Sequence, residues 1–293
     1  MRSLKFVKKT IKNFLGVTNE KIVFPLDSLE HLGAKFQGYW IPANFLNENS
    51  VCYLVGAGVD ISFDTEIKRK YNSKVYIFDP TPISKKYFEI LKGIAQREET
   101  MPRAYQDENF QYKIGYRQLQ DMQFIEKGVW SSKTKLKFFD SGSSDYVSHS
   151  IYFFKGNDNF TEFPVDTVKN FMKEFHHKSI DLLKLEIEGA EYEVIESILR
   201  DRLDIKILTV EFDEVYNKKG VSHLLRIKKA TNQLIGAGYV LVHSTHKLKR
   251  TFVRKDVYLQ LAKGPVNAVK EPKRHQEKET AKLLTPAFTQ EKP

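Results

Sequence analysis

Apolar residues along the chain fall into short runs that alternate with stretches of helical spacing. Val51–Val55 is a continuous apolar run. Gly56 follows it directly, and a helical pattern then continues through Tyr71. Lys74–Phe78 is a second run, after which Pro82 begins a predicted helix that continues to about Arg97, because proline is favoured in the first turn of a helix. Strands that alternate with helices predict a parallel sheet with helices on both faces.

The same alternation continues to residue 261. Further strands are predicted at Met122–Trp130, Thr134–Phe139, Ile180–Leu185 and Ile205–Val210, and further helices at Asp166–His176, Gly189–Leu199 and Val221–Ile235. Residues 98–121 are polar and irregular, like an insertion, and residues 140–150 form a loop rich in Ser, Asp and Gly. Tyr239–His243 and Thr251–Leu259 are close enough to form an antiparallel hairpin. The predicted fold class is α/β, a Rossmann-like, doubly wound, mostly parallel sheet with a C-terminal antiparallel hairpin.

The two ends of the chain differ in composition from the domain predicted at residues 20–261. Residues 1–19 carry five basic and no acidic side chains, with apolar residues at helical spacing. This basic amphipathic helix either packs on the domain or contacts a membrane surface through residues 1–17. We favour packing, because one short stripe is a weak signal. Residues 262–293 lose all periodicity and predict a disordered tail.

Charge and cysteine content narrow the range of partners. The net charge is +10, but residues 20–261 hold 35 basic and 33 acidic side chains, so the excess belongs to the ends. A near-neutral domain has no general attraction for polyanions, which argues against nucleic acid as a partner. The single cysteine, Cys52, excludes an internal disulfide and a cysteine-based zinc site. With no secretory signal and no apolar run of the ~18 residues that span a bilayer, we expect a cytoplasmic protein, peripheral to a membrane at most.

Polar and small residues follow the first two predicted strands, at the edge where parallel sheets bind ligands. Gly56, Ala57 and Gly58 come directly after the first strand, where backbone must approach a ligand closely. Asp79 ends the second strand, 21 positions after Gly58. An acid at this place commonly accepts hydrogen bonds from the ribose of a nucleotide cofactor. Together these residues predict a nucleotide-cofactor site.

The glycine-rich loop favours S-adenosylmethionine over NAD. A dinucleotide needs a third glycine so that the helix can approach the pyrophosphate, and that position holds Ile61. Asp60 beside the glycines would repel a pyrophosphate but suits a cofactor with a cationic amino-acid end. The predicted antiparallel hairpin at the end of the sheet favours the same choice.

Ionisable residues also cluster at the end of the strand predicted at Ile180–Leu185. Alternation places Lys184, Glu186 and Glu188 on one side if the strand continues through Glu188. Such groups are costly to bury unless they are paired or face a cleft, so a Lys–Glu pair between strands is the structural alternative to a catalytic role. Glu211 ends the next strand and is expected to face the same crevice.

These segments resemble the FkbM family of S-adenosylmethionine-dependent methyltransferases, over roughly residues 50–260. The family's Asp-Val-Gly-Ala-Asn-x-Gly motif is matched in part by Leu54–Asp60, and its acid-Pro motif by Asp79–Pro82, which includes Pro80 and Thr81. The motif Lys-x-Asp-x-Glu-Gly-Ala-Glu stands at Lys184–Glu191 with a glutamate in the Asp position, and Val-Glu-Phe recurs at Val210–Phe212.

The resemblance implies a class I methyltransferase that methylates a hydroxyl of a sugar, a lipid-linked glycan or a polyketide. We therefore expect S-adenosylmethionine as cofactor and a small-molecule or glycan acceptor. No metal ligands are predicted from the sequence, because the adjacent His176 and His177 would point to different sides of a helix. Glu186 or Glu188 is expected to act as base or to anchor the hydroxyl, with Lys184 orienting them and Glu211 nearby. In the glycine-rich motif Leu54 replaces the family's acid, and Asp60 is expected to substitute for it.

Three other functions compete with this interpretation. An NAD-dependent epimerase or dehydrogenase lacks support, because neither the third glycine nor a Tyr-x-x-x-Lys dyad is present. A nucleic-acid methyltransferase lacks its Asn/Asp-Pro-Pro-Tyr/Phe motif. A non-catalytic, methyltransferase-like binding module stays open because the glycine-rich motif is altered.

Overall fold

The computed structural model describes residue 22 and residues 26–140, 149–150, 160–212, 222–245 and 249–263. The chain divides into two units, Met1–Ala262 and Lys263–Pro293, and the fold given below is that of the first. The predicted N-terminal helix, nearly all of the predicted tail and most of the loop 140–150 lie outside the described residues. Within the described ranges, no helix is long and apolar enough to cross a membrane.

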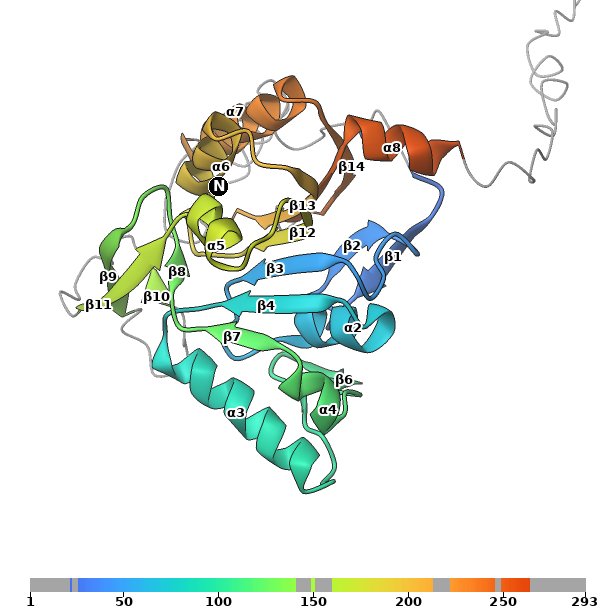
Figure 1. Ribbon diagram of the computed structural model, residues 1–293, viewed down its shortest axis with the longest axis vertical. Coiled ribbons are helices and arrows are strands. Elements are labelled where there is room, and N and C mark those ends of the chain that lie inside the picture. Colours follow the sequence, from blue (N-terminus) through green and yellow to red (C-terminus); the bar gives the residue numbers. More distant parts are fainter. Residues whose placement is uncertain are drawn as a thin grey trace, which may run out of the picture. The chain divides into compact units, whose positions relative to one another are not determined.

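A seven-stranded sheet forms the centre of the fold (Figure 1). In spatial order its strands are β14 (Tyr239–Ser244), β15 (Lys249–Arg254), β13 (Ile205–Glu211), β12 (Ile180–Leu185), β3 (Val51–Val55), β4 (Lys74–Phe78) and β7 (Gln123–Ile125). All neighbouring pairs from β13 to β7 are parallel, whereas β15 runs antiparallel to both of its neighbours. The strand order reverses between β3 and β12, and their carboxyl ends therefore meet at the point where such sheets bind ligands.

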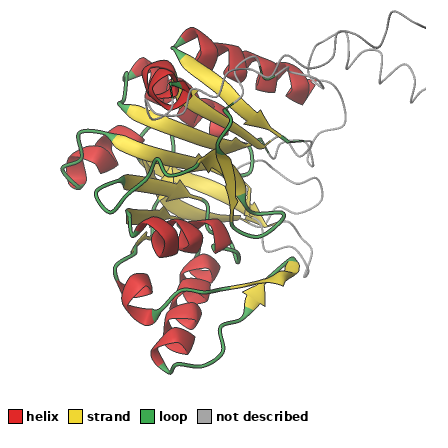
Figure 2. Ribbon diagram, turned by 90° about the vertical axis from the view of Figure 1, so that its right-hand side faces the viewer, coloured by secondary structure: helices red, strands yellow, loops and turns green. Residues whose placement is uncertain are grey.

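Helices cover both faces of this sheet (Figure 2). One face packs against α2 (Ser62–Tyr71), α3 (Pro82–Gln96), α4 (Tyr116–Gln120) and α8 (Lys255–Ala262), and the other against α5 (Val168–Glu174), α6 (Glu191–Arg200) and α7 (Ser222–Gly236). Residues of β3 alternate between the two cores, with Cys52 and Leu54 on the first and Tyr53 and Val55 on the second. A strand buried on both faces explains why β3 is a continuous apolar run.

The described residues also form three smaller sheets. They are the hairpin β1 (Leu29–Leu32) and β2 (Tyr39–Pro42), the pair β5 (Arg103–Ala104) and β6 (Asp107–Gln111), and the sheet of β8 (Gly128–Val129), β9 (Thr134–Asp140), β10 (His149–Ser150) and β11 (Phe160–Asp166). The backbone O of Trp40 in β2 accepts a hydrogen bond from Thr251 Oγ1 in β15 (2.6 Å). This bond ties the β1–β2 hairpin to the main sheet.

The mixed α/β fold and the terminal hairpin follow the prediction, but several boundaries were wrong. The insertion 98–121 is not irregular, since it contains β5, β6 and α4 and buries Tyr112 and Leu119 in the core. Elements of two to five residues are too short to show a periodicity. The strand predicted at Met122–Trp130 is two strands, β7 and β8, in different sheets.

Two further boundaries differ for identifiable reasons. The strand predicted at Thr251–Leu259 ends at Arg254, and α8 follows it with Asp256 in its first turn, where an acid is favourable. The helix predicted from Asp166 begins at Val168, because Thr167 is its N-cap and accepts a hydrogen bond from the Asn170 N–H. Asp166 itself ends β11.

His177 after α5 bridges two tyrosines on the face of the sheet that packs against α5. Its Nδ1 lies 2.8 Å from the hydroxyl of Tyr53 in β3, and its Nε2 lies 3.3 Å from that of Tyr76 in β4. Partial burial lowers the pKa of His177, and the charges of Lys74 and His176 lower it further. The imidazole is therefore neutral in the folded protein at neutral pH.

We expect this bridge to make stability sensitive to acid. The pKa of His177 is lower in the folded chain than the value of about 6.5 in the unfolded chain, so its contribution is complete above about pH 6.5 and is lost as the pH falls below that value. His177→Phe should reduce the loss of unfolding free energy between about pH 7.5 and pH 5, measured by urea unfolding. Lys178→Gln, at an exposed neighbour that does not contribute to the pKa shift of His177, is the control and should leave the loss unchanged.

Candidate active site

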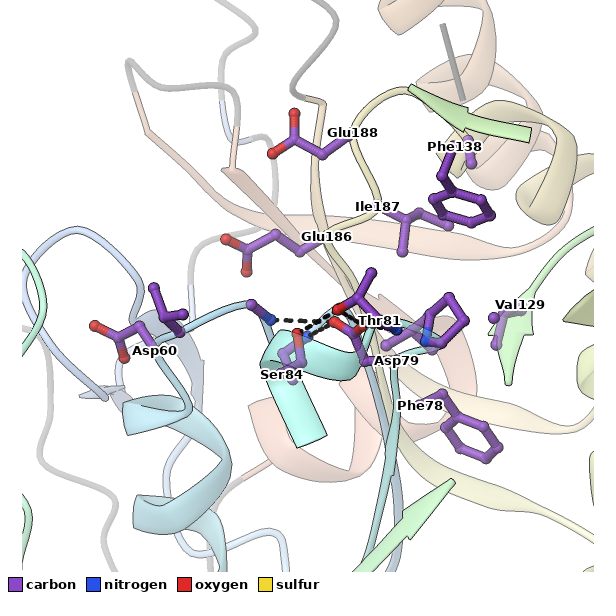
Figure 3. A pocket seen from close by; sticks show the side chains of 18 of the residues that line it. Asp60, Phe78, Asp79, Thr81, Ser84, Val129, Phe138, Glu186, Ile187 and Glu188 are labelled. Atoms are coloured by element: carbon purple, nitrogen blue, oxygen red, sulfur yellow. Dashed lines mark hydrogen bonds between the residues drawn. The ribbon is translucent and has the colours of Figure 1, made fainter. Parts of the chain in front are cut away.

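A cavity of about 210 Å³ opens at the carboxyl ends of β3, β4 and β12 (Figure 3). The glycine-rich loop and Asp79 form its floor. Asp60, Glu186 and Glu188 lie toward one end, and Phe78, Val129 and Phe138 lie toward the other. The cavity therefore has an acidic end and an apolar end, joined by exposed backbone.

Gly56 allows two strands to meet at this floor. Its φ is +85°, and a Cβ built on it would lie 1.9 Å from the carbonyl oxygen of Glu186. The N–H of Gly56 donates to the oxygen of Phe78 (3.0 Å), and the N–H of Glu186 donates to the oxygen of Val55 (3.2 Å). Only glycine fits here, because any side chain would push the β12 end away from β3. At Gly58 the φ is +52° and a Cβ would meet no atom within 4 Å.

Asp79 holds the glycine-rich loop in place. One carboxylate oxygen accepts from the N–H groups of Ala57 (2.9 Å) and Gly58 (3.1 Å), and the other accepts from the N–H (2.9 Å) and hydroxyl (2.6 Å) of Thr81. These four bonds use the full accepting capacity of a carboxylate. The expectation that Asp79 offers free acceptors to a ribose is therefore not met in this arrangement, in which the acid positions the loop. Pro80 and Thr81 line the cavity beside it.

Asp60 presents an oxygen without a partner. Its Oδ1 accepts from the N–H of Ser62 (2.8 Å) and the hydroxyl of Tyr112 (3.3 Å), whereas Oδ2 is shielded from solvent and has no hydrogen-bond partner. Burial raises the pKa of Asp60. A buried carboxylate oxygen without a partner is costly unless a donor or a cation reaches it.

Glu191 fixes the conformation of the loop that carries Glu186 and Glu188. The residue is fully buried, and its Oε1 accepts from the N–H groups of Ile187 (2.8 Å) and Gly189 (3.3 Å). Burial raises the pKa of Glu191 to about 8. Glu188 adopts a positive φ of 53° between these bonds, so β12 does not continue through Glu188 as alternation required; it ends at Leu185.

Lys184 lies behind the cavity and does not line it, contrary to expectation. Its ammonium is 3.0 Å from Oδ2 of Asp64 in α2 and 4.0 Å from Oε2 of Glu186, and its side chain is 2% exposed. Although burial opposes it, the charges of Asp64 and Glu186 raise the pKa of Lys184. The structural alternative of a Lys–acid pair is thus realised, with the partner on a helix.

Glu211 is also set back from the cavity lining, where the sequence placed it in the crevice. It ends β13, with Oε2 2.6 Å from Nζ of Lys249, the first residue of β15. The hydroxyl of Tyr39 donates to Oε2 of Glu186 (2.9 Å), and its ring lies 4.1 Å from the same ammonium. Tyr39 and Lys249 were missed by the sequence analysis, because only the strand pairing brings Lys249 opposite Glu211.

A family model described as "Methyltransferase FkbM domain" matches residues 53–237, more than half of the chain. The chain belongs to the FkbM methyltransferase family. Among solved structures, the fibrillarin pre-rRNA processing protein of Methanococcus jannaschii is similar to it at 11% identity, with 71% of this chain and 68% of that chain covered and a TM-score of 0.37. No curated protein matches the chain.

The rest of the cavity in this FkbM methyltransferase comes from residues that the sequence analysis did not single out. Apart from the labelled acids and loop residues, the lining includes Gln37, Tyr105, Gln106, Trp130 and Leu136. They belong to three separate segments around the sheet edge and share no motif. Within the part of the chain that the structure describes, no group of three or more His, Cys, Asp or Glu side chains could hold a metal ion.

Substituting Gly56→Ala in this FkbM-family chain should separate β3 from β12. We expect the free energy of unfolding to fall by at least about 2 kcal/mol, from the clash with Glu186 and the left-handed φ. Gly58→Ala is the matched control, because it has the same sign of φ and open space, and should cost about 1 kcal/mol. Equal losses in the two variants, measured by urea unfolding, would contradict the close approach.

Lys184→Met should leave Asp64 buried without its cation. We expect a loss of about 3–5 kcal/mol in unfolding free energy, as when one partner of a buried ion pair is removed. The double variant Lys184→Met/Asp64→Leu should recover most of this loss, because no uncompensated charge remains. A double variant no more stable than the single one would show that the ion pair is not the reason.

Proposed function

We propose that this protein is an S-adenosylmethionine-dependent O-methyltransferase that acts on a hydroxyl of a sugar, a glycan or a related small molecule. The observation that carries the proposal is the cavity with one acidic and one apolar end across a glycine-rich loop. S-adenosylmethionine has the matching polarity, with an ammonium and a sulfonium at one end and an adenine ring at the other. Membership of the FkbM family supports the same cofactor.

The residues present fit this cofactor. Asp60 lines the acidic end of the cavity, where a carboxylate suits the ammonium group and would repel the pyrophosphate of a dinucleotide. The open space at Gly58 leaves the loop backbone accessible. Val129, Trp130 and Phe138 supply apolar surface for a flat ring.

The strand order of the main sheet supports a class I arrangement. On one side of the reversal point, β3, β4 and β7 follow one another outward in chain order. On the other side β12 and β13 come first, and the last strand, β15, lies antiparallel between β13 and β14. This order supports a doubly wound, Rossmann-like topology with a terminal hairpin, as expected of a class I methyltransferase. Its ligand site is expected at the reversal, where the cavity lies.

In methyl transfer the protein mainly positions the acceptor and removes its proton. When bound, the cofactor supplies a methyl group on a positively charged sulfur. The chain then has to orient the acceptor hydroxyl in line, exclude water and take up a proton. Glu186 and Glu188 both lie at the acidic end of the cavity and can accept that proton.

Calorimetric titration with S-adenosylmethionine tests this function. Asp60→Asn should weaken binding about tenfold to hundredfold, the range expected for loss of a charge-assisted contact. Asp121→Asn, on an exposed acid outside the cavity lining that lies 3.8 Å from the ammonium of Lys68, is the control and should bind like the unaltered protein. Binding of NAD in place of S-adenosylmethionine would overturn the proposal.

A further inference from the structure

Five charged side chains of alternating sign lie in a row beneath the acidic end of the cavity. In order they are Asp64, Lys184, Glu186, Lys249 and Glu211, and the successive nitrogen–oxygen distances are 3.0, 4.0, 3.9 and 2.6 Å. They come from α2, β12, the loop after β12, β15 and β13. Only Glu186 lines the cavity; the other four side chains are at most 8% exposed.

This row contains three carboxyl groups and two ammonium groups, so full ionisation would leave an excess negative charge in a buried place. Such a charge is expensive. A proton on one of the carboxyl groups removes the excess. The outer pair, Asp64 with Lys184, is a close ion pair, which leaves Glu186 and Glu211 as the two groups that compete around Lys249.

The surroundings place that proton on Glu211. Burial and the charge of Glu186 raise the pKa of Glu211 to about 8, although Lys249 works against them. For Glu186, the charges of Lys249 and Lys184 and the hydroxyl of Tyr39 overcome the effect of burial and lower the pKa. The two carboxyl groups are within hydrogen-bonding reach of each other, so they titrate as one coupled pair.

We propose that Glu186, Lys249 and Glu211 form a proton relay, in which Glu186 takes the proton of the acceptor hydroxyl and Glu211 holds it. Lys249 is the positioning residue, because its ammonium contacts both carboxyl groups. The relay rests on the proposed methyltransferase function and selects Glu186 over Glu188 as the base. With both carboxylates ionised, the pair is a base whose strength matches neutral to mildly alkaline conditions.

The transfer balances as follows. The acceptor oxygen forms a bond to the methyl carbon, the carbon–sulfur bond breaks, and its electron pair stays on sulfur, which becomes neutral. The O–H electron pair stays on the acceptor oxygen, and the proton passes to Glu186, from there to Glu211, and finally to water. No oxidant, reductant or further reactant is needed.

Other titratable groups also face the relay. Tyr39 contacts Glu186 and Lys249 from β2, and Asp60 and Asp64 act on Glu186 or on Lys184 from the region of α2. His31 in β1 is close enough for Lys249 to lower its pKa. His31 is therefore neutral near pH 8 and adds no charge in the range where the pair titrates.

The decisive experiment follows the glutamate carboxyl carbons by NMR in uniformly folded protein labelled with ¹³C at the side-chain carboxyl. Glu211→Gln assigns the signal of Glu211 by its disappearance. In the unaltered protein we expect Glu211 to titrate near pH 8, and titration below about pH 6 would overturn the relay. This measurement needs neither cofactor nor acceptor.

Two variants should move the Glu211 signal in opposite directions. Lys249→Met removes a positive charge and should raise the titration midpoint by about one pH unit or more, whereas Glu186→Gln removes a negative charge and should lower it similarly. Lys249→Arg should restore it to within about half a unit of the original value, since the charge returns. Lys206→Met is the matched control, because Lys206 is a strand lysine paired with a different acid, Asp181, and should cause no shift.

Methyl transfer gives a second readout, with simple methyl glycosides as acceptor probes. The initial rate should rise with pH through the same midpoint. Glu211→Gln should move this rise about two pH units lower, since the partner carboxyl group with the raised pKa is then absent. An unmoved pH profile in Glu211→Gln would refute the relay. Absence of S-adenosylmethionine binding in calorimetry would instead refute the proposed function, while the carboxyl titration would still decide whether the pair shares a proton.

Discussion

The contact between Gly56 and the peptide of Glu186 is the constraint on which the rest of the site depends. It brings the ends of β3 and β12 together where the strand order reverses, with no room for a side chain between them. Asp79 then fixes the loop beyond Gly56, and Glu191 fixes the loop beyond Glu186. The carboxyl groups of Asp79 and Glu191, each of which accepts from two or more backbone N–H groups, thus hold the two loops that line the cavity.

The electrostatics of the site follow from that geometry. Once Glu186 is held at the cavity edge, it is within reach of ammonium groups from β12 and β15 and of the hydroxyl of Tyr39. These groups stabilise the negative charge of Glu186, and the residue also lines the cavity. Buried ion pairs contribute little net stability, so their value here lies in fixing which carboxyl group is charged.

Much of the fold could be predicted from the sequence where strands are long and buried. Lys74–Phe78 and Ile180–Leu185 were predicted with the observed ends, because each is a compact apolar run bounded by polar residues. The insertion 98–121 was not, since β5, β6 and α4 have two to five residues and depend on tertiary contacts such as the burial of Tyr112. For the site, the glycine-rich loop, Asp79, Glu186 and Glu188 were singled out and line one cavity, whereas Lys184 and Glu211 are set back from it. Lys249 and Tyr39 could not be found, because their importance depends on strand pairing between distant parts of the chain.

The position of Lys249 near the C-terminal end of the domain also matters during synthesis. Asp64, Lys184, Glu186 and Glu211 are all synthesised before the second cation, which comes only with β15. Until then three carboxyl groups share a single lysine, and β13 lacks the neighbour that covers its outer edge. The order of synthesis thus places the most acidic part of the site before its counter-charge. The charges of the row reach their final balance only when β15 is inserted between β14 and β13.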